Sequence, residues 1–218
     1  RYELWSQVER SFKKIDLHAS ISASENSLWR EGYVANGKFP TNSKGLSAKA
    51  NFTNYGFKSG LVYKITGRHF ITGNVSAQSR PPLSSNLFTS PTTRNDVVAG
   101  IGNERIVSAD INYIVKYTSL KCRLTYYNTF FFNQYRVRTF WSDEYNTMVN
   151  LVIKHTNVHH HGIELSLEKT VRSQHSFTGA IGLGRFTYAN RSTLDAWQNT
   201  TSLALFSDRV AYLKNFRE

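Results

Sequence analysis

The chain has 218 residues and a formal net charge of +12, from 27 lysine and arginine residues against 15 aspartate and glutamate residues. Aromatic residues make up 14% of it, which is too much apolar surface for a disordered chain. No apolar run approaches the roughly 18 residues that a transmembrane helix needs, and the single cysteine, Cys122, excludes an internal disulfide framework and a multi-cysteine zinc site.

The first regular pattern lies between Ile15 and Ala23, where odd positions are apolar and even positions are polar or charged. This period of two predicts a β-strand with two different faces. The polar stretch 32–45 follows and contains the tight-turn pair Asn36-Gly37. We therefore expect a strand and then a long loop that folds over the end of the sheet.

A second long polar stretch, 78–103, contains three of the four prolines, and proline removes a donor from a sheet ladder. Loops longer than about 15 residues are usually functional or disordered, so this stretch is the best candidate for substrate recognition. Its candidate contact residues are Arg80, Phe88, Arg94, Asn95 and Asp96. The alternative is that Arg94 and Asp96 brace the loop against neighbouring segments.

Alternation returns in the stretches 107–117, 120–127 and 163–168. Short polar turns alternate along the chain with long polar stretches. The short turns lie near 11–14, 66–68, 118–119 and 171–174, and the long stretches are 32–45, 78–103, 133–146 and 190 onward. Short turns at one end and long loops at the other are typical of an outer-membrane β-barrel, whereas a soluble sandwich mixes loop lengths at both ends. Residues 148–170 also form one extended pattern of roughly 75 Å, and aromatic residues gather toward strand ends.

The sequence thus predicts an all-β fold, an antiparallel transmembrane β-barrel of about seven or eight long strands, located in the bacterial outer membrane. The apolar phase, which includes Val115 and Leu124, should contact lipid. The polar phase should face a wet lumen. The charged residues that we expect to face the lumen are Asp110, Lys116, Lys121, Arg123, Glu164 and Glu168.

Residues 51–70, with the sequence NFTNYGFKSGLVYKITGRHF, resemble the barrel of TonB-dependent outer-membrane receptors in the form common in Bacteroidota. The stretches 90–97 (SPTTRNDV), 123–129 (RLTYYNT) and 161–165 (HGIEL) carry the same resemblance. It implies a 22-stranded barrel with an N-terminal plug, which takes up a nutrient such as a glycan, peptide or metal chelate with energy passed through TonB.

The resemblance also implies partners and a place in a larger protein. No plug or TonB box is visible, so we expect all of residues 1–218 to be an internal part of a receptor barrel. The expected partners are the outer membrane with its lipopolysaccharide, the rest of the same receptor chain, TonB through the plug, and a surface lipoprotein lid. The alternative is a stand-alone small outer-membrane barrel with a structural or adhesion role.

Other functions have weaker support in the sequence. In a strand, His159 and His161 share a face while His160 points away, so three metal ligands do not converge. Asp143 and Glu144 are merely adjacent in an expected loop, and no hydrolase or metalloprotease motif occurs. The basic residues are spread along the chain rather than clustered. We therefore expect no metal, no cofactor, no enzymatic activity and no nucleic-acid partner.

Overall fold

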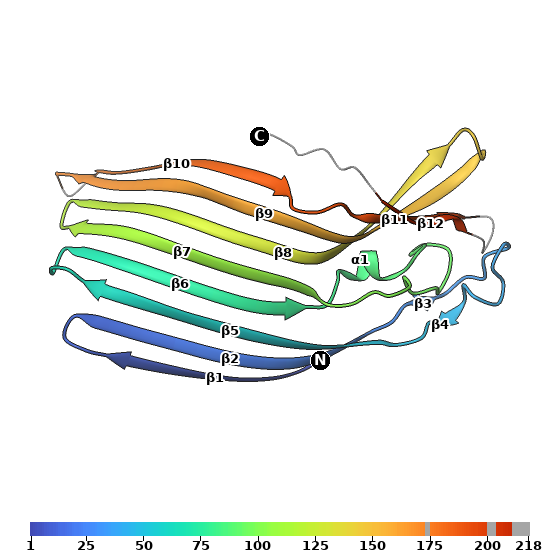
Figure 1. Cartoon of the computed structure of the whole chain (residues 1–218), viewed down its shortest axis with the longest axis horizontal. Coiled ribbons are helices and arrows are strands. Elements are labelled where there is room, and N and C mark those ends of the chain that lie inside the picture. Colours follow the sequence, from blue (N-terminus) through green and yellow to red (C-terminus); the bar gives the residue numbers. More distant parts are fainter. Residues whose placement is uncertain (173–174, 200–203, 211–218) are drawn as a thin grey trace.

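The computed structural model describes residues 1–172, 175–199 and 204–210, and almost all of its regular structure is strand. Figure 1 shows long, nearly parallel ribbons that form one curved sheet. The strands are β1 (Tyr2–Ser11), β2 (Ile15–Leu28), β3 (Glu31–Gly32), β4 (Gly45–Leu46), β5 (Ala50–Lys64), β6 (His69–Arg80), β7 (Glu104–Tyr117), β8 (Leu120–Ser142), β9 (Thr147–Val171), β10 (His175–Tyr188), β11 (Thr193–Gln198) and β12 (Ala204–Val210). Helix α1 (Ser84–Leu87) is a single turn. Within the described ranges, no helix is long and apolar enough to cross a membrane.

Ten strands form the main sheet, in the order β1-β2-β5-β6-β7-β8-β9-β11-β12, with β10 also paired to β9. β10 and β11 pair with successive parts of β9, so they share one position across the sheet. All of these pairings are antiparallel. The prediction of an all-β, antiparallel fold is therefore confirmed. Within the described residues, β1 and β12 are the two edges of the sheet.

Three short hairpin turns lie at one end of the sheet, and the two long connections lie at the other, together with the four-residue turn between β8 and β9 (Figure 1). Hairpin turns at 12–14, 65–68 and 118–119 agree with the predicted short turns. The fourth, predicted at 171–174, lies partly outside the described residues. The long connections 29–49, which carries the small β3–β4 pair, and 81–103, which carries α1, lie at the opposite end.

Two expectations about elements are wrong, and one strand was not named in advance. Most of the predicted loop 133–146 is strand, because β8 continues to Ser142 and β9 begins at Thr147. The stretch from residue 190 onward, expected as loop, contains β11 and β12. β1 is a strand that the sequence did not suggest. Its two faces are each mixed in polarity, so no clear period of two marks it.

The strands are staggered in a regular way. One row of paired residues runs Ile15, Tyr63, Ile71, Tyr113, Leu124, Leu165, Ile181. In β2 this row passes through the first residue of the strand, Ile15. Six strands across the sheet, in β10, the row passes through Ile181, which is six residues after the first residue of that strand. The stagger is therefore about one residue per strand. With about 3.3 Å per residue and about 4.8 Å between strands, the strands tilt by about 35° from the normal to the line of short turns.

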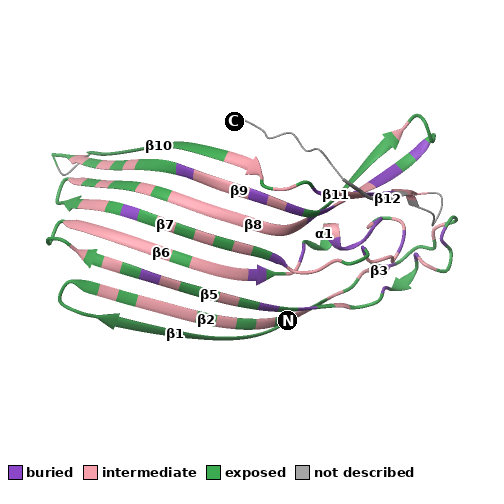
Figure 2. Ribbon diagram, viewed as in Figure 1, coloured by how far each residue is buried: buried purple, intermediate pink, exposed green. Residues whose placement is uncertain are grey.

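Both hydrophobic clusters of buried residues lie at the long-loop end. One joins Phe52 on β5 to Leu87 and Phe88, and the other joins Val98 to Tyr135 on β8 and Val152 on β9. The loop 81–103 thus fills the space between the ends of β5 and of the β8–β9 hairpin, and Figure 2 shows buried residues concentrated there. The packed part of the protein is a loop-covered end of the sheet.

Over the rest of the sheet, one face is apolar and exposed. Register places the odd-numbered residues of β2, β5, β6, β7 and β10 on this face, together with the odd-numbered residues of β9 from His159 on and the even-numbered residues of β8 up to Phe132. Its large exposed residues include Leu17, Ile21, Phe57, Leu61, Val75, Ile111, Leu124, Ile163, Leu165, Ile181 and Leu183. We call this surface the apolar face and the opposite one the polar face.

Candidate functional site

The six charged residues expected to face a lumen share the polar face. The even-numbered residues of β7 and β9 pair with odd-numbered residues of β8, so Lys116, Lys121 and Glu168 form one continuous row. Arg123 lies in the next row and Glu164 in the one after, opposite Thr125, while Asp110 lies further along β7 opposite Tyr127. This common orientation follows from the period of two in the sequence.

Most of these charges have nearby partners. The Lys121 ammonium lies 2.9 Å from a Glu168 carboxylate oxygen. Asp110 accepts hydrogen bonds from the side-chain amides of Asn74, at 2.8 Å, and Asn112, at 2.6 Å. The polar face is therefore a hydrogen-bonded, hydrated surface rather than a row of isolated charges.

A hollow of about 200 Å³ lies on the polar face close to the short-turn end. Its lining includes three cations and one carboxylate: Lys116, Lys121, Arg123 and Glu168. Lys116 also lies over the ring of Phe70, at 5.5 Å from its centre. Since one carboxylate faces three cationic side chains, the local field is positive, and the hollow suits an anionic group.

Tyr127 lies flat along the polar face because its neighbours lack side chains. A Cβ added to Gly162 or Gly184 would come within 2.7 Å of the Tyr127 hydroxyl oxygen. Gly162 is paired to Tyr127 on β8 and to Gly184 on β10. The two glycines thus leave room for the Tyr127 ring to lie across the neighbouring strands instead of projecting from the sheet.

The loop candidate Arg94 is deeply buried, with 1% of its side chain exposed. Its guanidinium lies 5.1 Å from the ring centres of both Phe39 and Trp197, and its Nε is 3.1 Å from a carboxylate oxygen of Asp96. Burial lowers the pKa of Arg94, and the charge of Asp96 opposes that change. Arg94 thus ties the loops 29–49 and 81–103 to β11.

Two neighbouring candidates also bind other parts of the protein. The backbone N–H of Asn95 donates to the Asn42 carbonyl at 2.8 Å. An oxygen of the Asp96 carboxylate accepts from the Asn42 side-chain amide at 2.7 Å. These contacts hold the two long loops together, as the bracing alternative requires. Asp96 keeps 44% of its side chain exposed, so it still has surface for a ligand.

The side chains of the remaining loop candidates make other contacts, although the backbone of Phe88 pairs with Val97, next to Asp96. Phe88 is buried in the cluster with Phe52 and Leu87. Arg80, at the end of β6, is bound to the buried Glu104 at 2.8 Å. Direct contact of this loop with a substrate stays a prediction.

Sequence reasoning missed Arg30, the residue that holds the loops most directly. Its guanidinium donates to the carbonyls of Pro91, at 2.8 Å, and Ser43, at 2.9 Å, and to the side-chain oxygen of Asn95. Only its position, a basic residue between a strand end and a long loop, could have drawn attention to it. Partners that lie about 60 positions away leave no local pattern.

A buried ion pair was missed for the same reason. Lys154 on β9 and Asp195 on β11 are 2.8 Å apart, with 8% and 6% of their side chains exposed. Nearby, the Asn199 side-chain oxygen accepts hydrogen bonds from Asn150 and, at 2.8 Å, from Ser90. These polar contacts join β9, the end of β11 and the loop 81–103.

The histidine run is arranged as its spacing predicts. His159 and His161 stack on one side with ring centres 4.7 Å apart, and Phe130 stacks on His159 at 4.0 Å. His160 lies on the other side, against Phe131 and Phe186. Among the described residues, no group of three or more histidine, cysteine, aspartate or glutamate side chains could hold a metal ion.

A scan against protein-family models and searches of curated proteins and of solved structures found no match to this chain. Its function is therefore inferred from its residues and their geometry.

Proposed function

We propose that the chain is part of the β-barrel of a TonB-dependent outer-membrane receptor, which takes up a nutrient such as a glycan, peptide or metal chelate. In this proposal the apolar face contacts lipid, the polar face lines the lumen, and the loops 29–49 and 81–103 lie at the outer mouth. The remaining barrel strands and the plug belong to other parts of the receptor chain.

One observation carries the proposal: the apolar face of the sheet is exposed along most of its length, and the long loops pack only at one end of the sheet. Leu183, Ile181 and Ile111 keep 76%, 66% and 54% of their surface exposed, although they lie in the middle of long strands. A water-soluble protein buries such a face against a second layer. Lipid is an environment in which this face is favourable as it stands.

The dimensions of the apolar face support the same proposal. On β7 it extends from Val107 to Tyr117, which is ten residue steps or about 33 Å along the strand. At a tilt of about 35° this corresponds to a height of about 27 Å, close to the apolar band of about 25 Å on outer-membrane barrels. The tilt itself lies at the lower end of the range found in barrels.

Aromatic residues border the apolar face at both ends. Tyr55, Phe130 and Phe132 lie toward the long loops, and Phe130 and Phe132 stack with ring centres 5.9 Å apart. Tyr117 lies toward the short turns, where its hydroxyl is 3.3 Å from a ring nitrogen of His69. Rings with a polar edge favour the interface between lipid and water, so two such zones agree with a spanning sheet.

The facing of the sheet is tested by two adjacent aliphatic residues of β5. With Cys122 replaced by alanine, a single cysteine is introduced at Leu61, on the apolar face, or at Val62, on the polar face. We expect Leu61→Cys to carry a fluorophore that is quenched by nitroxide-labelled lipid and to resist a charged maleimide. Val62→Cys should show the opposite behaviour. Equal access of the charged reagent to both positions would refute a lipid-facing apolar face.

The transport function needs a separate test. Cells with and without TonB, and with and without this protein, are compared for growth on panels of glycans, peptides and metal chelates. We expect growth on at least one of these nutrients to require both TonB and this protein. An antibody against the loop 81–103 should detect a species several times larger than 24.9 kDa. A mature species of that smaller mass would favour the stand-alone structural or adhesive barrel.

A further inference from the structure

Two arginines, Arg105 on β7 and Arg185 on β10, lie on the apolar face toward its border with the long loops. Arg105 is the second residue of β7, and register places it on the apolar face beside Phe132 of β8. We propose that Arg105, with Tyr55 and Phe132, binds the phosphate of a phosphorylated lipid in the outer leaflet. This inference rests on the proposed function, because it requires the apolar face to lie in lipid.

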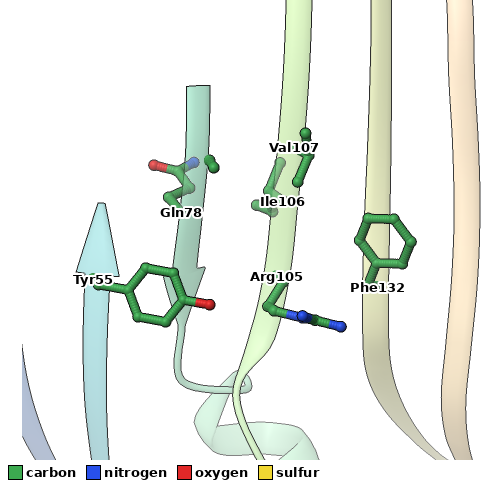
Figure 3. A pocket seen from close by; sticks show the side chains of 7 residues that line it. Tyr55, Gln78, Arg105, Ile106, Val107 and Phe132 are labelled. Atoms are coloured by element: carbon green, nitrogen blue, oxygen red, sulfur yellow. The ribbon is translucent and has the colours of Figure 1, made fainter. Parts of the chain in front are cut away.

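The three side chains surround a shallow hollow of about 290 Å³ that spans β5 to β8. Figure 3 shows the guanidinium of Arg105 extended toward the ring of Phe132, with the Tyr55 hydroxyl directed toward Arg105 from the opposite side. The small Ala77 lies between β5 and β7 and leaves the floor of the hollow open. No carboxylate contributes to the lining.

The guanidinium of Arg105 lies 5.6 Å from the centre of the Phe132 ring. Within the described part of the chain it makes no hydrogen bond and no ion pair, whereas Arg80, one strand away, is bound to Glu104 on the polar face. An exposed guanidinium keeps its five donors available, and its planar fork matches two oxygens of a phosphate. The phenol of Tyr55 supplies a further donor.

The position of the hollow favours a lipid phosphate over a free ion. The aliphatic Val107 continues the same face toward the short turns, while the polar loop 81–103 begins beyond the other end of the hollow. A ligand that fits this border has an anionic head level with Arg105 and apolar chains along Val107. Aromatic rings on either side suit the headgroup level of a membrane, where their edges are wet and their faces are dry.

The test uses the full receptor, purified in detergent and stripped of lipid. Bis-phosphorylated lipid A, the same lipid without phosphates, and inorganic phosphate are the probes, and retained lipid is measured by native mass spectrometry and titration. The variants are Arg105→Gln, Arg105→Lys and Tyr55→Phe. Lys58→Gln is the matched control, since it removes one positive charge from the polar face of the same sheet.

We expect the wild-type receptor and Lys58→Gln to retain phosphorylated lipid A equally. Arg105→Gln should weaken binding about tenfold or more, because charge-assisted hydrogen bonds to the phosphate are lost. Arg105→Lys should be intermediate, since it keeps the charge and loses the fork. Tyr55→Phe, which removes only one hydroxyl, gives a second measurement if Arg105→Gln assembles poorly.

Three results would overturn the inference. Lipid A without phosphates could bind wild type as tightly as the phosphorylated form. Arg105→Gln and Tyr55→Phe could both bind like the Lys58→Gln control. Inorganic phosphate could displace the lipid at equal concentration, which would identify a free-anion site. If Leu61→Cys is shielded by lipid while any of these holds, the lipid site is wrong and the barrel proposal stands. If Leu61→Cys is not shielded, the barrel proposal itself fails.

Discussion

Leu124 is the residue at which the orientation of the sheet can be tested most sharply. It lies on the apolar face in the middle of a row, between Tyr113 on β7 and Leu165 on β9, with 45% of its surface exposed. In Leu124→Arg, a guanidinium would take its place. Near the bilayer midplane that costs about 2–4 kcal/mol in folding free energy. Loss of the apolar contact between the exposed half of Leu124 and lipid adds about 1 kcal/mol to this cost.

The matched control is the same substitution one residue further along β8. Thr125 faces the other way, opposite Glu164, and its hydroxyl donates to the Asn112 side-chain oxygen at 2.6 Å. In Thr125→Arg, that hydrogen bond is lost at a cost of about 1 kcal/mol, and the new cation gains a carboxylate neighbour. The control therefore changes the same charge and volume at nearly the same depth.

The two variants are compared by denaturant titration of the receptor folded into lipid vesicles, with an unboiled gel as the measure of the assembled barrel. We expect Leu124→Arg to lower the free energy of unfolding by at least about 2 kcal/mol more than Thr125→Arg, which is over tenfold in the equilibrium. In cells, Leu124→Arg should assemble poorly, and Arg123→Ser, on the polar face, should assemble normally. If Thr125→Arg or Arg123→Ser proves the more damaging, the assignment of faces is inverted.

The other predictions concern the long-loop end. Arg30→Gln removes charged hydrogen bonds worth about 1.5 kcal/mol or more and should speed proteolysis within 81–103 at least tenfold; an unchanged rate would show that Arg30 does not hold the loop. Burial raises the pKa of Tyr135, so its stabilising contribution is complete below the ordinary tyrosine pKa of about 10 and is lost as pH rises through the raised value. The free energy of unfolding measured by denaturant titration should therefore fall in strong alkali, and Tyr135→Phe should reduce that fall; an identical alkaline loss in the variant would exclude Tyr135 as its cause. Protease added to intact cells should cut the exposed turn 143–146 and spare 118–119, and the reverse pattern would invert the topology.

The fold class could be predicted from the sequence because it depends on local alternation. From Val107 to Tyr117 the polarity of every residue except Ile114 agrees with the face on which it lies. The short turns were found for a similar reason, since a two- or three-residue polar interruption between alternating runs has few other structures available.

The candidate site was harder to predict because its contacts join distant segments. Nothing near Arg94 in the sequence indicates that its partners include Phe39 and Trp197, more than 50 and 100 positions away. A positively charged residue in a long polar loop is a reasonable candidate for ligand contact, and only the folded arrangement reveals that its side chain is buried. Arg30 was overlooked for the same reason.

The predicted loop at 133–146 failed because two β-bulges hide the strand pattern. Phe131 pairs with Val158, Gln134 with Thr156, and Arg136 with Ile153, so β8 gains one residue and β9 then gains one. Asn133 and His155, at these bulges, both have positive φ, at 60° and 55°. Each extra residue reverses the alternation, so the period of two breaks at that point and a strand resembles a loop.

The opposed bulges also affect how this protein can change during evolution. Because the two extra residues cancel, the pairing of Arg136 with Ile153 has the same register as the pairing of Phe131 with Val158. A later insertion or deletion between the bulges and the turn 143–146 would alter the length of the hairpin tip, and the bulges would keep that change from shifting the ladder below them. The outer part of the hairpin is thus free to diverge in length and sequence, while the part below it keeps one register.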